Sequence, residues 1–261
     1  MYILIGTLIY RSGAYVLDKF LANQQEIQLR YPASELIMAT AEMDYLEELE
    51  SVIRRRNLRG KVIYFDVEKP AYSKSRLWNI ACGREAIRHY LLTNTDAGAL
   101  LYLDADMTFN PEVISIMKHE MPGYGAVFSG YRFKNNRIGL AGAGCLLLTR
   151  EALERIQFRC YEFRNGQVIN EDNILEMDLY GRGFRIKKGF FLEIDHHVSD
   201  TEYKRMHPQR IRLFRKIANH SLVRYWLMKA SIKYHLNIPD KGQRALWRSL
   251  SFFDKLPGAG R

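Results

Sequence analysis

The sequence has few cysteines and no long apolar stretch. Its three cysteines, Cys82, Cys145 and Cys160, are an odd number at wide spacings, which excludes a disulfide framework and a zinc-binding pattern. No segment approaches the roughly 20 apolar residues that cross a bilayer. The short apolar run at residues 3–9 lacks the basic region that precedes the core of a signal peptide. We therefore expect a folded protein in a reducing cytoplasm.

Charge is distributed unevenly along the chain. The 261 residues carry a net charge of +10, and 47% of them are hydrophobic, which suits the core of one large α/β domain. Residues 203–261 hold 14 basic and 2 acidic residues, whereas residues 1–202 hold 25 basic and 27 acidic residues. The whole positive excess lies in the last fifth of the chain. Composition therefore predicts a main domain at residues 1–202 and a basic, largely helical extension at residues 203–261.

Segments with strand and helix periodicity alternate through the first two thirds of the chain. Strands are expected at residues 2–5, 36–38, 61–65 and 99–103, with apolar residues at helical spacing between them. Repeated alternation of this kind predicts a mainly parallel sheet with helices on both faces. The later part is less regular, with strands expected at residues 125–129, 145–148, 184–186 and 190–194.

Acidic residues follow several of the expected strands. Sheets of this class bind ligands outside the carboxyl ends of their strands. The residues at those positions are Gly6 with Thr7, Glu42, Asp66, and Asp104 with Asp106. Three of these four places carry carboxylates, so the mouth of the sheet is expected to be acidic.

Asp104 and Asp106 follow an almost wholly apolar strand. Two carboxylates two residues apart at a strand end can reach one hard cation, and Mg²⁺ and Mn²⁺ take oxygen ligands and often keep a diphosphate in their shell. An isolated pair of this kind is most often a solvated acidic turn. The apolar strand favours the metal site here, because two charged residues placed at the end of a buried strand call for a functional explanation.

Two further pairs carry candidate chemistry. Glu171 and Asp172 open an expected helix, where the helix dipole alone stabilises acidic residues by about 0.3–1 kcal/mol. Their functional interpretation is a general base that takes a proton from an acceptor hydroxyl. His196 and His197 follow an expected strand, and neutral imidazole suits Mn²⁺ better than Mg²⁺. An isolated histidine pair is more often part of the surface or the core.

The order of these features resembles a known family. The sequence LYLDAD at residues 101–106 is followed by GAGCLLLTREAL at residues 142–153, EDNIL at residues 171–175 and GFRI at residues 183–186. This ordered set is similar to the GT-A glycosyltransferases, especially the family 2-like group, over roughly residues 2–200. The resemblance implies a Rossmann-like GT-A fold and transfer of a hexose from a nucleotide-sugar donor to an acceptor that the sequence does not name.

The resemblance also implies a role for each matching residue. Asp106 would bind the metal and the diphosphate, and Asp104 would lie near the ribose or share the metal. Asp172 would be the base in an inverting transfer, with Glu171 the second choice. His197 or His196 would complete the shell of Mn²⁺ or Mg²⁺.

The nucleotide is expected to meet residues before and beside these acids. Thr7 and Glu42 fall where the family holds the nucleobase and the ribose, and Lys74, Arg76 and Asn79 fall in the segment that often meets the nucleotide. The sequence departs from the family at residues 6–10, in place of a Pro-x-Tyr-Asn-like turn, and at residues 39–42, in place of paired acids. The Gln-x-x-Arg-Trp motif and the membrane spans of processive synthases are absent, which argues against a processive enzyme.

The basic extension has three interpretations. A helix is expected from Pro208 to about Leu236, with apolar residues near one face and basic residues elsewhere. It can pack on the main domain with a solvated basic face. Alternatively, it can lie on the anionic inner face of the cytoplasmic membrane. Nucleic acid is the least favoured partner, because no nucleic-acid-binding motif is present.

Two functions compete with glycosyl transfer. Sugar-phosphate nucleotidyltransferases share the α/β design, but residues 6–13 lack the full Gly-rich loop with Arg and Lys that they carry. A non-catalytic transferase-like domain that binds a membrane or a partner through its basic extension is the other alternative.

Overall fold

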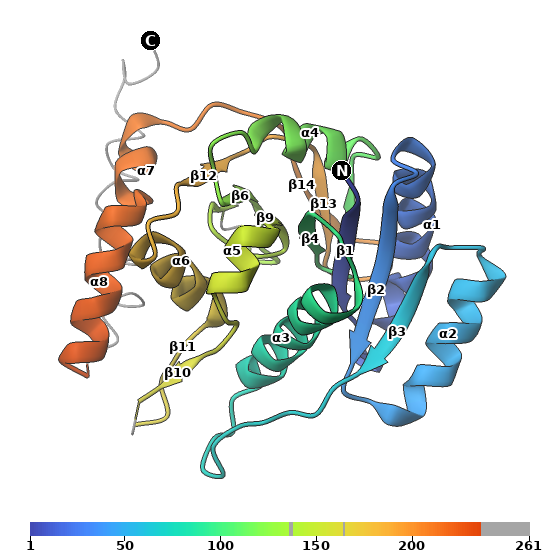
Figure 1. Ribbon diagram of the computed structural model, residues 1–261, viewed down its shortest axis with the longest axis horizontal. Coiled ribbons are helices and arrows are strands. Elements are labelled where there is room, and N and C mark those ends of the chain that lie inside the picture. Colours follow the sequence, from blue (N-terminus) through green and yellow to red (C-terminus); the bar gives the residue numbers. More distant parts are fainter. Residues whose placement is uncertain (136–137, 164, 236–261) are drawn as a thin grey trace.

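A seven-stranded sheet runs through the centre of the protein (Figure 1). The structure is a computed structural model that describes residues 1–135, 138–163 and 165–235. The strands lie in the order β12-β6-β9-β4-β1-β2-β3. Their bounds are β1 Ile3–Leu8, β2 Ser34–Thr40, β3 Gly60–Tyr64, β4 Ala99–Leu103, β6 Ala126–Ser129, β9 Cys145–Thr149 and β12 Ile186–Gly189. Within this sheet β9 runs antiparallel to β4 and β6, and the other pairings are parallel, which confirms a mainly parallel mixed sheet.

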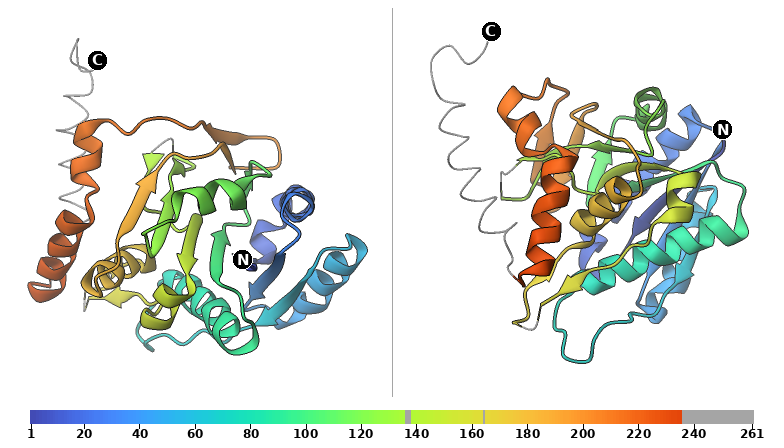
Figure 2. Two further views of the ribbon diagram at one scale, coloured as in Figure 1. Left: turned by 45° about the horizontal axis from the view of Figure 1, so that its top comes forward. Right: turned by 60° about the vertical axis from the view of Figure 1, so that its left-hand side comes forward.

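Helices cover both faces of the sheet, as the alternation predicted (Figures 1 and 2). One face packs against α1 (Ala14–Arg30), α2 (Leu46–Arg55) and α4 (Val113–Glu120), and the other against α3 (Leu77–Asn94), α5 (Arg150–Arg155) and α6 (Glu171–Gly181). Strand β4 shows why: Leu101 belongs to the first apolar core, and Leu100 and Tyr102 belong to the second. A strand buried on both faces reads as a continuous apolar run.

A small antiparallel sheet begins immediately after Asp106. Its strands are β5 (Met107–Phe109), β13 (Ile194–His197) and β14 (Tyr203–Met206), in the order β14-β13-β5. His196 lies opposite Met107 in this register, so Asp106 and His196, which are 90 positions apart in the sequence, become neighbours. The histidines were expected to follow a strand at residues 190–194. They lie inside a strand instead, because β13 pairs with β5 on one side and β14 on the other.

The remaining elements are short. Two strand pairs, β7 (Tyr131–Arg132) with β8 (Ile138–Gly139) and β10 (Tyr161–Glu162) with β11 (Val168–Ile169), form antiparallel ribbons. Single turns of 3-10 helix lie at Arg11–Gly13 and Met43–Tyr45. No helix in the described part of the chain is long and apolar enough to cross a membrane.

The basic extension differs from the single helix expected over residues 208–236. Two helices form instead, α7 (Leu213–Ala218) and α8 (Ser221–Lys233), because His220 has extended backbone and its side chain caps the amide of Leu222. Helix α8 runs alongside α6 (Figures 1 and 2), where Met228 packs with Ile174. Residues 236–261 lie outside the described residues. The boundary near residue 202 stays a prediction, and β14 pairs with β13 just beyond it.

Candidate functional site

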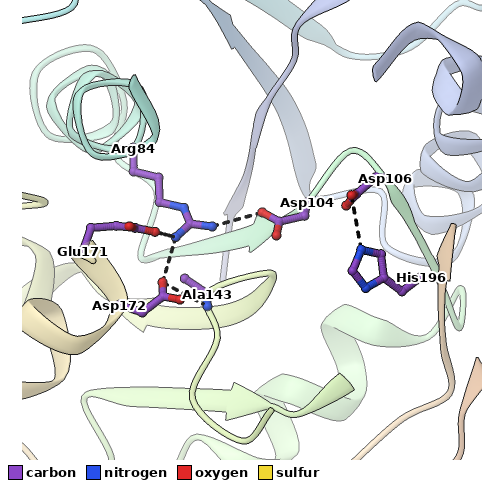
Figure 3. Close-up of polar contacts among 7 residues, drawn as sticks. All are labelled: Arg84, Asp104, Asp106, Ala143, Glu171, Asp172 and His196. Carbon is purple, nitrogen blue, oxygen red and sulfur yellow. Dashed lines mark hydrogen bonds and ion pairs between the residues drawn. The ribbon is translucent and has the colours of Figure 1, made fainter. Parts of the chain in front are cut away.

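The candidate site lies at the carboxyl end of β4, beside the start of α6 and strand β13 (Figure 3). Asp104 and Asp106 follow β4 here. The backbone amide of Asp104 donates to the Gly144 carbonyl over 3.1 Å. A Cβ atom at Gly144 would lie 2.7 Å from Asp104 Oδ2, so the loop can approach this carboxylate closely only because residue 144 is glycine. The glycine-rich segment of the sequence motif therefore covers one side of Asp104.

An arginine that the sequence patterns did not single out joins the acids of the site. Arg84 comes from α3, and its guanidinium lies among carboxylates from two other segments (Figure 3). Its Nη1 donates to Glu171 Oε1 over 2.5 Å and to Asp172 Oδ1 over 2.9 Å. Its Nη2 donates to Asp104 Oδ1 over 3.0 Å. One side chain thus connects the end of β4 to the start of α6.

The sequence carries one signal for Arg84. It shares the buried face of α3 with Ile87 and Leu91, at helical spacing. A charge at a core position is costly unless it is paired and hydrogen-bonded, so such a residue marks a buried ion cluster. The partners cannot be read from the sequence, because they lie 20, 87 and 88 positions away.

Glu171 and Asp172 open α6, as predicted, but they face different surroundings. The Asp172 side chain is 18% exposed, and its Oδ1 also accepts a hydrogen bond from the Ala143 amide over 3.2 Å. The Glu171 side chain is 4% exposed, and its Oε2 has no hydrogen-bond partner among the described residues. Asp172 is therefore the acid of this pair that a bound molecule can reach.

Three carboxylates share one guanidinium in this cluster. The pKa of Glu171 is raised to about 8: burial is the largest cause, the charge of Asp172 also raises it, and Arg84 opposes the rise. Burial also raises the pKa of Asp104, again against the lowering effect of Arg84. A pKa near 8 keeps Glu171 largely protonated at neutral pH. The single positive charge of Arg84 is then shared between the two aspartates, Asp104 and Asp172.

Asp106 has cationic partners of its own. Its Oδ2 lies 3.2 Å from His196 Nε2 (Figure 3). The same oxygen lies 2.9 Å from Lys134 Nζ. Burial alone would raise the pKa of Asp106, but His196 and Lys134 outweigh it and lower the pKa. Burial would likewise lower the pKa of His196, and the adjacent Asp106 raises it overall. Asp106 is thus a carboxylate held in its charged form and surrounded by positive groups.

The contacts of His196 suit a divalent cation. Its Nδ1 lies 2.7 Å from the Arg132 carbonyl oxygen, which only accepts, so Nδ1 carries a proton. If a cation takes the place of the proton on Nε2, the ring is neutral and its Nε2 lone pair binds the ion, while Nδ1–H donates to a carbonyl, as in many metal-binding histidines. The 3.2 Å between Nε2 and Asp106 Oδ2 matches two neighbouring ligands of one ion, since bonds of about 2.1 Å at right angles place donors about 3 Å apart.

The two residues do not complete a cation site by themselves. No group of three or more His, Cys, Asp or Glu side chains in the described part of the chain is arranged to hold a metal ion. A cation bound to Asp106 and His196 would take its remaining ligands from water and from a diphosphate, which is the usual pattern for Mg²⁺ sites. The donor set therefore fits an ion that arrives with a phosphate ligand.

His197 faces away from this pair. Its Nε2 lies 3.2 Å from Thr108 Oγ1, and its Nδ1 is buried without a partner among the described residues. Neighbouring residues of a strand project to opposite faces, so one of the two histidines can face Asp106, and here it is His196. Sequence alone left the choice between them open.

The residues expected around the nucleotide are more dispersed. Thr7 is 1% exposed, and its Oγ1 has no hydrogen-bond partner in the described part of the chain. Glu42 accepts a hydrogen bond from the Arg11 amide over 2.7 Å and so stabilises the turn after β1. Lys74 and Arg76 are exposed in the segment that leads into α3, and Asn79 lies in the first turn of that helix. The acids, Arg84 and His196 form the contiguous part of the site.

Comparison with known proteins gives similarity of structure only. No profile of a known protein family matches the chain, and no curated protein matches its sequence. The 1–349 fragment of S. aureus TarS is similar with a TM-score of 0.51 and 14% identity, covering 95% of this chain and 78% of that one. This similarity, together with the strand order, shows that the chain has the GT-A fold.

Two other solved structures are similar at lower TM-scores. Mannosyltransferase PcManGT from Pyrobaculum calidifontis, in complex with GDP-Man and Mn²⁺, has a TM-score of 0.48 and 15% identity, over 71% of this chain and 53% of that one. The chain thus spans about half the length of that protein. The inositol-1-phosphate CTP transferase from T. maritima has a TM-score of 0.44 and 10% identity, over 72% of this chain and 84% of that one.

Proposed function

We propose that the protein transfers a hexose from a nucleotide-sugar donor to an acceptor hydroxyl, in a metal-dependent, inverting and non-processive reaction. The observation that carries the proposal is that acids from two different elements, β4 and α6, face each other in one site. Asp104 and Asp106 lie at the end of β4, and Asp172 lies opposite them on α6, joined to Asp104 through Arg84. The GT-A fold supports this assignment, because ligands of such sheets bind at the carboxyl ends of the strands.

Asp106 and His196 are the residues proposed to hold Mn²⁺ or Mg²⁺, and an imidazole ligand favours Mn²⁺. A divalent cation there would stabilise the negative charge that develops on the leaving diphosphate. Lys134 contacts the same Asp106 oxygen and is 45% exposed, so it is free to move onto a phosphate. Asp104 is fixed by Arg84 and is the candidate for the ribose contact or for a shared metal contact.

Asp172 is the proposed general base. Both of its hydrogen bonds with described residues go to Oδ1, from Arg84 and from the Ala143 amide. Oδ2 is then the oxygen that accepts the proton of the acceptor hydroxyl while the new glycosidic bond forms. Glu171 is the second choice, because its carboxyl is buried beneath Arg84 and its raised pKa keeps it protonated.

Thr7, Glu42, Lys74 and Arg76 are proposed to meet the nucleotide. Thr7 lies in β1, next to β4 in the sheet, and its hydroxyl is buried without a hydrogen-bond partner among the described residues. A buried polar atom without a partner is an exception in folded proteins and calls for an explanation such as a ligand. Lys74 and Arg76 would add positive charge near the phosphates.

We propose that the C-terminal helices bind the anionic inner face of the cytoplasmic membrane. Large apolar side chains are exposed on α7 and α8, and basic residues lie among them. The apolar residues are Leu213, Ile217, Leu222, Val223 and Trp226, and the basic ones are Lys216, Lys229 and Lys233. Exposed apolar groups interleaved with lysines suit the interface of an anionic bilayer. A membrane-borne or lipid-linked acceptor would agree with this surface.

One assay tests the proposed function against its competitors. The full chain is incubated with a panel of nucleotide-sugars and Mn²⁺, and separately with nucleoside triphosphates and sugar phosphates. Hydrolysis or transfer of a nucleotide-sugar that needs Mn²⁺ is the expected result. Turnover in the second set alone would identify a nucleotidyltransferase, and turnover in neither would identify a non-catalytic binding domain.

A further inference from the structure

The guanidinium of Arg84 is enclosed by the acids of the site. Only 5% of the side chain is exposed, and its terminal nitrogens donate to Asp104, Glu171 and Asp172 (Figure 3). A group enclosed to this degree does not reach a substrate. Any effect of Arg84 on the reaction must therefore pass through the carboxylates that it holds.

Two features fix Arg84 against the sheet, and one of them is a contact with β4, the strand that leads to Asp104. The Tyr102 hydroxyl donates to the Arg84 carbonyl over 2.6 Å, inside the core. The preceding residue is Gly83, where a Cβ would lie 2.4 Å from Leu8 and 2.8 Å from Phe65. Helix α3 thus approaches the sheet as closely as it can at this point, and the arginine extends from the point of closest approach.

The geometry points to Arg84 as a positioning residue for the reaction: it holds the proposed base Asp172 at a fixed place relative to Asp104 on the donor side. This inference rests on the proposed function. The planar guanidinium spans the gap, with Nη2 on Asp104 and Nη1 on Asp172. A planar fork fixes direction as well as distance, which a single ammonium cannot do.

Glu171 restricts the arginine further. Its carboxyl accepts a hydrogen bond from Arg84 Nη1, the same nitrogen that donates to Asp172. Rotation of the guanidinium would break bonds to acids on both sides at once. The arginine keeps its proton throughout: Asp172 takes the proton of the acceptor hydroxyl, the acceptor oxygen bonds to the sugar carbon, and the diphosphate leaves with the electron pair.

The test compares two arginine-to-lysine substitutions on one helix. Arg84→Lys keeps a positive charge and loses the fork. Arg88→Lys is the matched control, because Arg88 lies one turn further along α3, is 12% exposed and bonds to Glu85 and to the Leu153 carbonyl. Steady-state kinetics with the donor found in the panel assay, and thermal melting, are measured for the wild type and both variants.

Arg84→Lys is expected to lower kcat by about 10–100-fold, because misplacing a reacting group by about 1 Å can cost 10²-fold. The donor KM should change by less than about three-fold, since Asp106 and His196 keep their own contacts to Lys134 and the Arg132 carbonyl. Arg88→Lys should leave both kinetic constants within about two-fold, even if it melts as early as Arg84→Lys.

A double substitution separates action through the base from a general loss of structure. In an Asp172→Asn background, Arg84→Lys should lower kcat no further, because coupled residues are not additive. A full additional loss would show that Arg84 acts independently of the base and would overturn the inference. So would an unchanged kcat for Arg84→Lys, or a raised donor KM at unchanged kcat.

Misfolding of the variant and inactivity of the wild type each have a distinct reading. If Arg84→Lys does not fold, the paired change Arg84→Gln with Glu171→Gln removes one cation and one acid, and the same loss of kcat at constant donor KM is expected. Normal kcat in that pair would overturn the inference. Absence of turnover by the wild type would instead refute the proposed function itself, and with it the inference. Normal turnover by the wild type and by Arg84→Lys alike would refute the inference alone.

Discussion

Helix α6 carries two buried glutamates whose surroundings are opposite in charge. Glu171, in its first turn, shares the single cation Arg84 with two aspartates, and burial raises its pKa to about 8. Glu176, five residues later, contacts both Lys188 and Arg224, and its side chain is 2% exposed. Burial would raise the pKa of Glu176 too, but Arg224 and Lys188 lower it overall.

The difference shows that burial does not by itself set the charge of an acid in this protein. The number of cations within hydrogen-bond reach decides it. The Glu176 cluster has its acid fully paired and fixes α6 against α8 and β12. The Arg84 cluster has more acids than cations, which favours a ligand that brings positive charge, such as a metal ion.

Removing the proposed metal ligand should have the largest effect. Asp106→Ala is expected to abolish Mn²⁺-dependent binding of a nucleoside diphosphate, because His196 alone cannot hold the ion. Isothermal titration calorimetry with and without Mn²⁺ measures it. The matched change Asp178→Ala removes a carboxylate that pairs with Arg159 outside the site and should leave the binding intact. Unchanged metal-dependent affinity in Asp106→Ala would remove this residue from the site.

Asp172→Asn should lower turnover by about 10²–10⁴-fold, the usual contribution of a general base. The donor affinity should stay nearly constant, since the base acts on the acceptor hydroxyl. Rapid-quench kinetics and equilibrium binding give the two quantities. Glu171→Gln is the control from the same helical turn. Loss of turnover in Glu171→Gln with normal turnover in Asp172→Asn would move the base by one residue, and a product of retained configuration would contradict the role.

Glu176→Gln should affect stability rather than chemistry. It leaves Lys188 and Arg224 buried without their acid, and breaking a buried ion pair costs about 3–5 kcal/mol of folding free energy. Urea denaturation measures the loss, and turnover per folded molecule should stay within about two-fold. A fall in turnover comparable to that of Asp172→Asn would erase the distinction between the two clusters.

The two glutamates should also give opposite pH dependence of stability. The folded-state pKa of Glu171 is raised, so its folded carboxyl holds a proton that the unfolded chain releases, and stability falls as pH rises from about 4.5 to about 8. Glu171→Gln should flatten that limb. The folded-state pKa of Glu176 is lowered, so its contribution is present above the unfolded pKa and falls as pH falls through the folded value. Melting temperatures from pH 4 to 9 test both, and an unchanged fall in stability between about pH 4.5 and about 8 in Glu171→Gln would refute the first.

The smallest effect is expected for the cations on the outside of α8. Arg224 faces inward and is paired with Glu176, whereas Lys229 is exposed. Lys229→Glu should weaken binding to anionic liposomes by about 1–2 kcal/mol, since each lysine near the surface contributes about 1 kcal/mol. Lys61→Glu changes the net charge equally, at an exposed position in β3. Equal sedimentation of both variants with liposomes would refute a membrane surface on α8.

The sequence by itself determined the fold class of the protein and the positions of its acidic residues along the chain. Alternating apolar segments predicted a parallel sheet with helices on both faces, because the period of apolar residues records which faces are buried. The apolar strand before Asp104 placed the two aspartates at the end of β4, and the acidic start of α6 placed Glu171 and Asp172. These features are local, and a few neighbouring residues are enough to specify them.

Tertiary structure alone decided which of these groups meet. His196 rather than His197 faces Asp106, because the register of β13 against β5 sets the side to which each residue projects. Arg84 reaches acids up to 88 positions away, and the expected single C-terminal helix became two. Contacts between distant segments depend on how the helices and strands pack, and hydrophobic periodicity does not encode the partner of a buried charge.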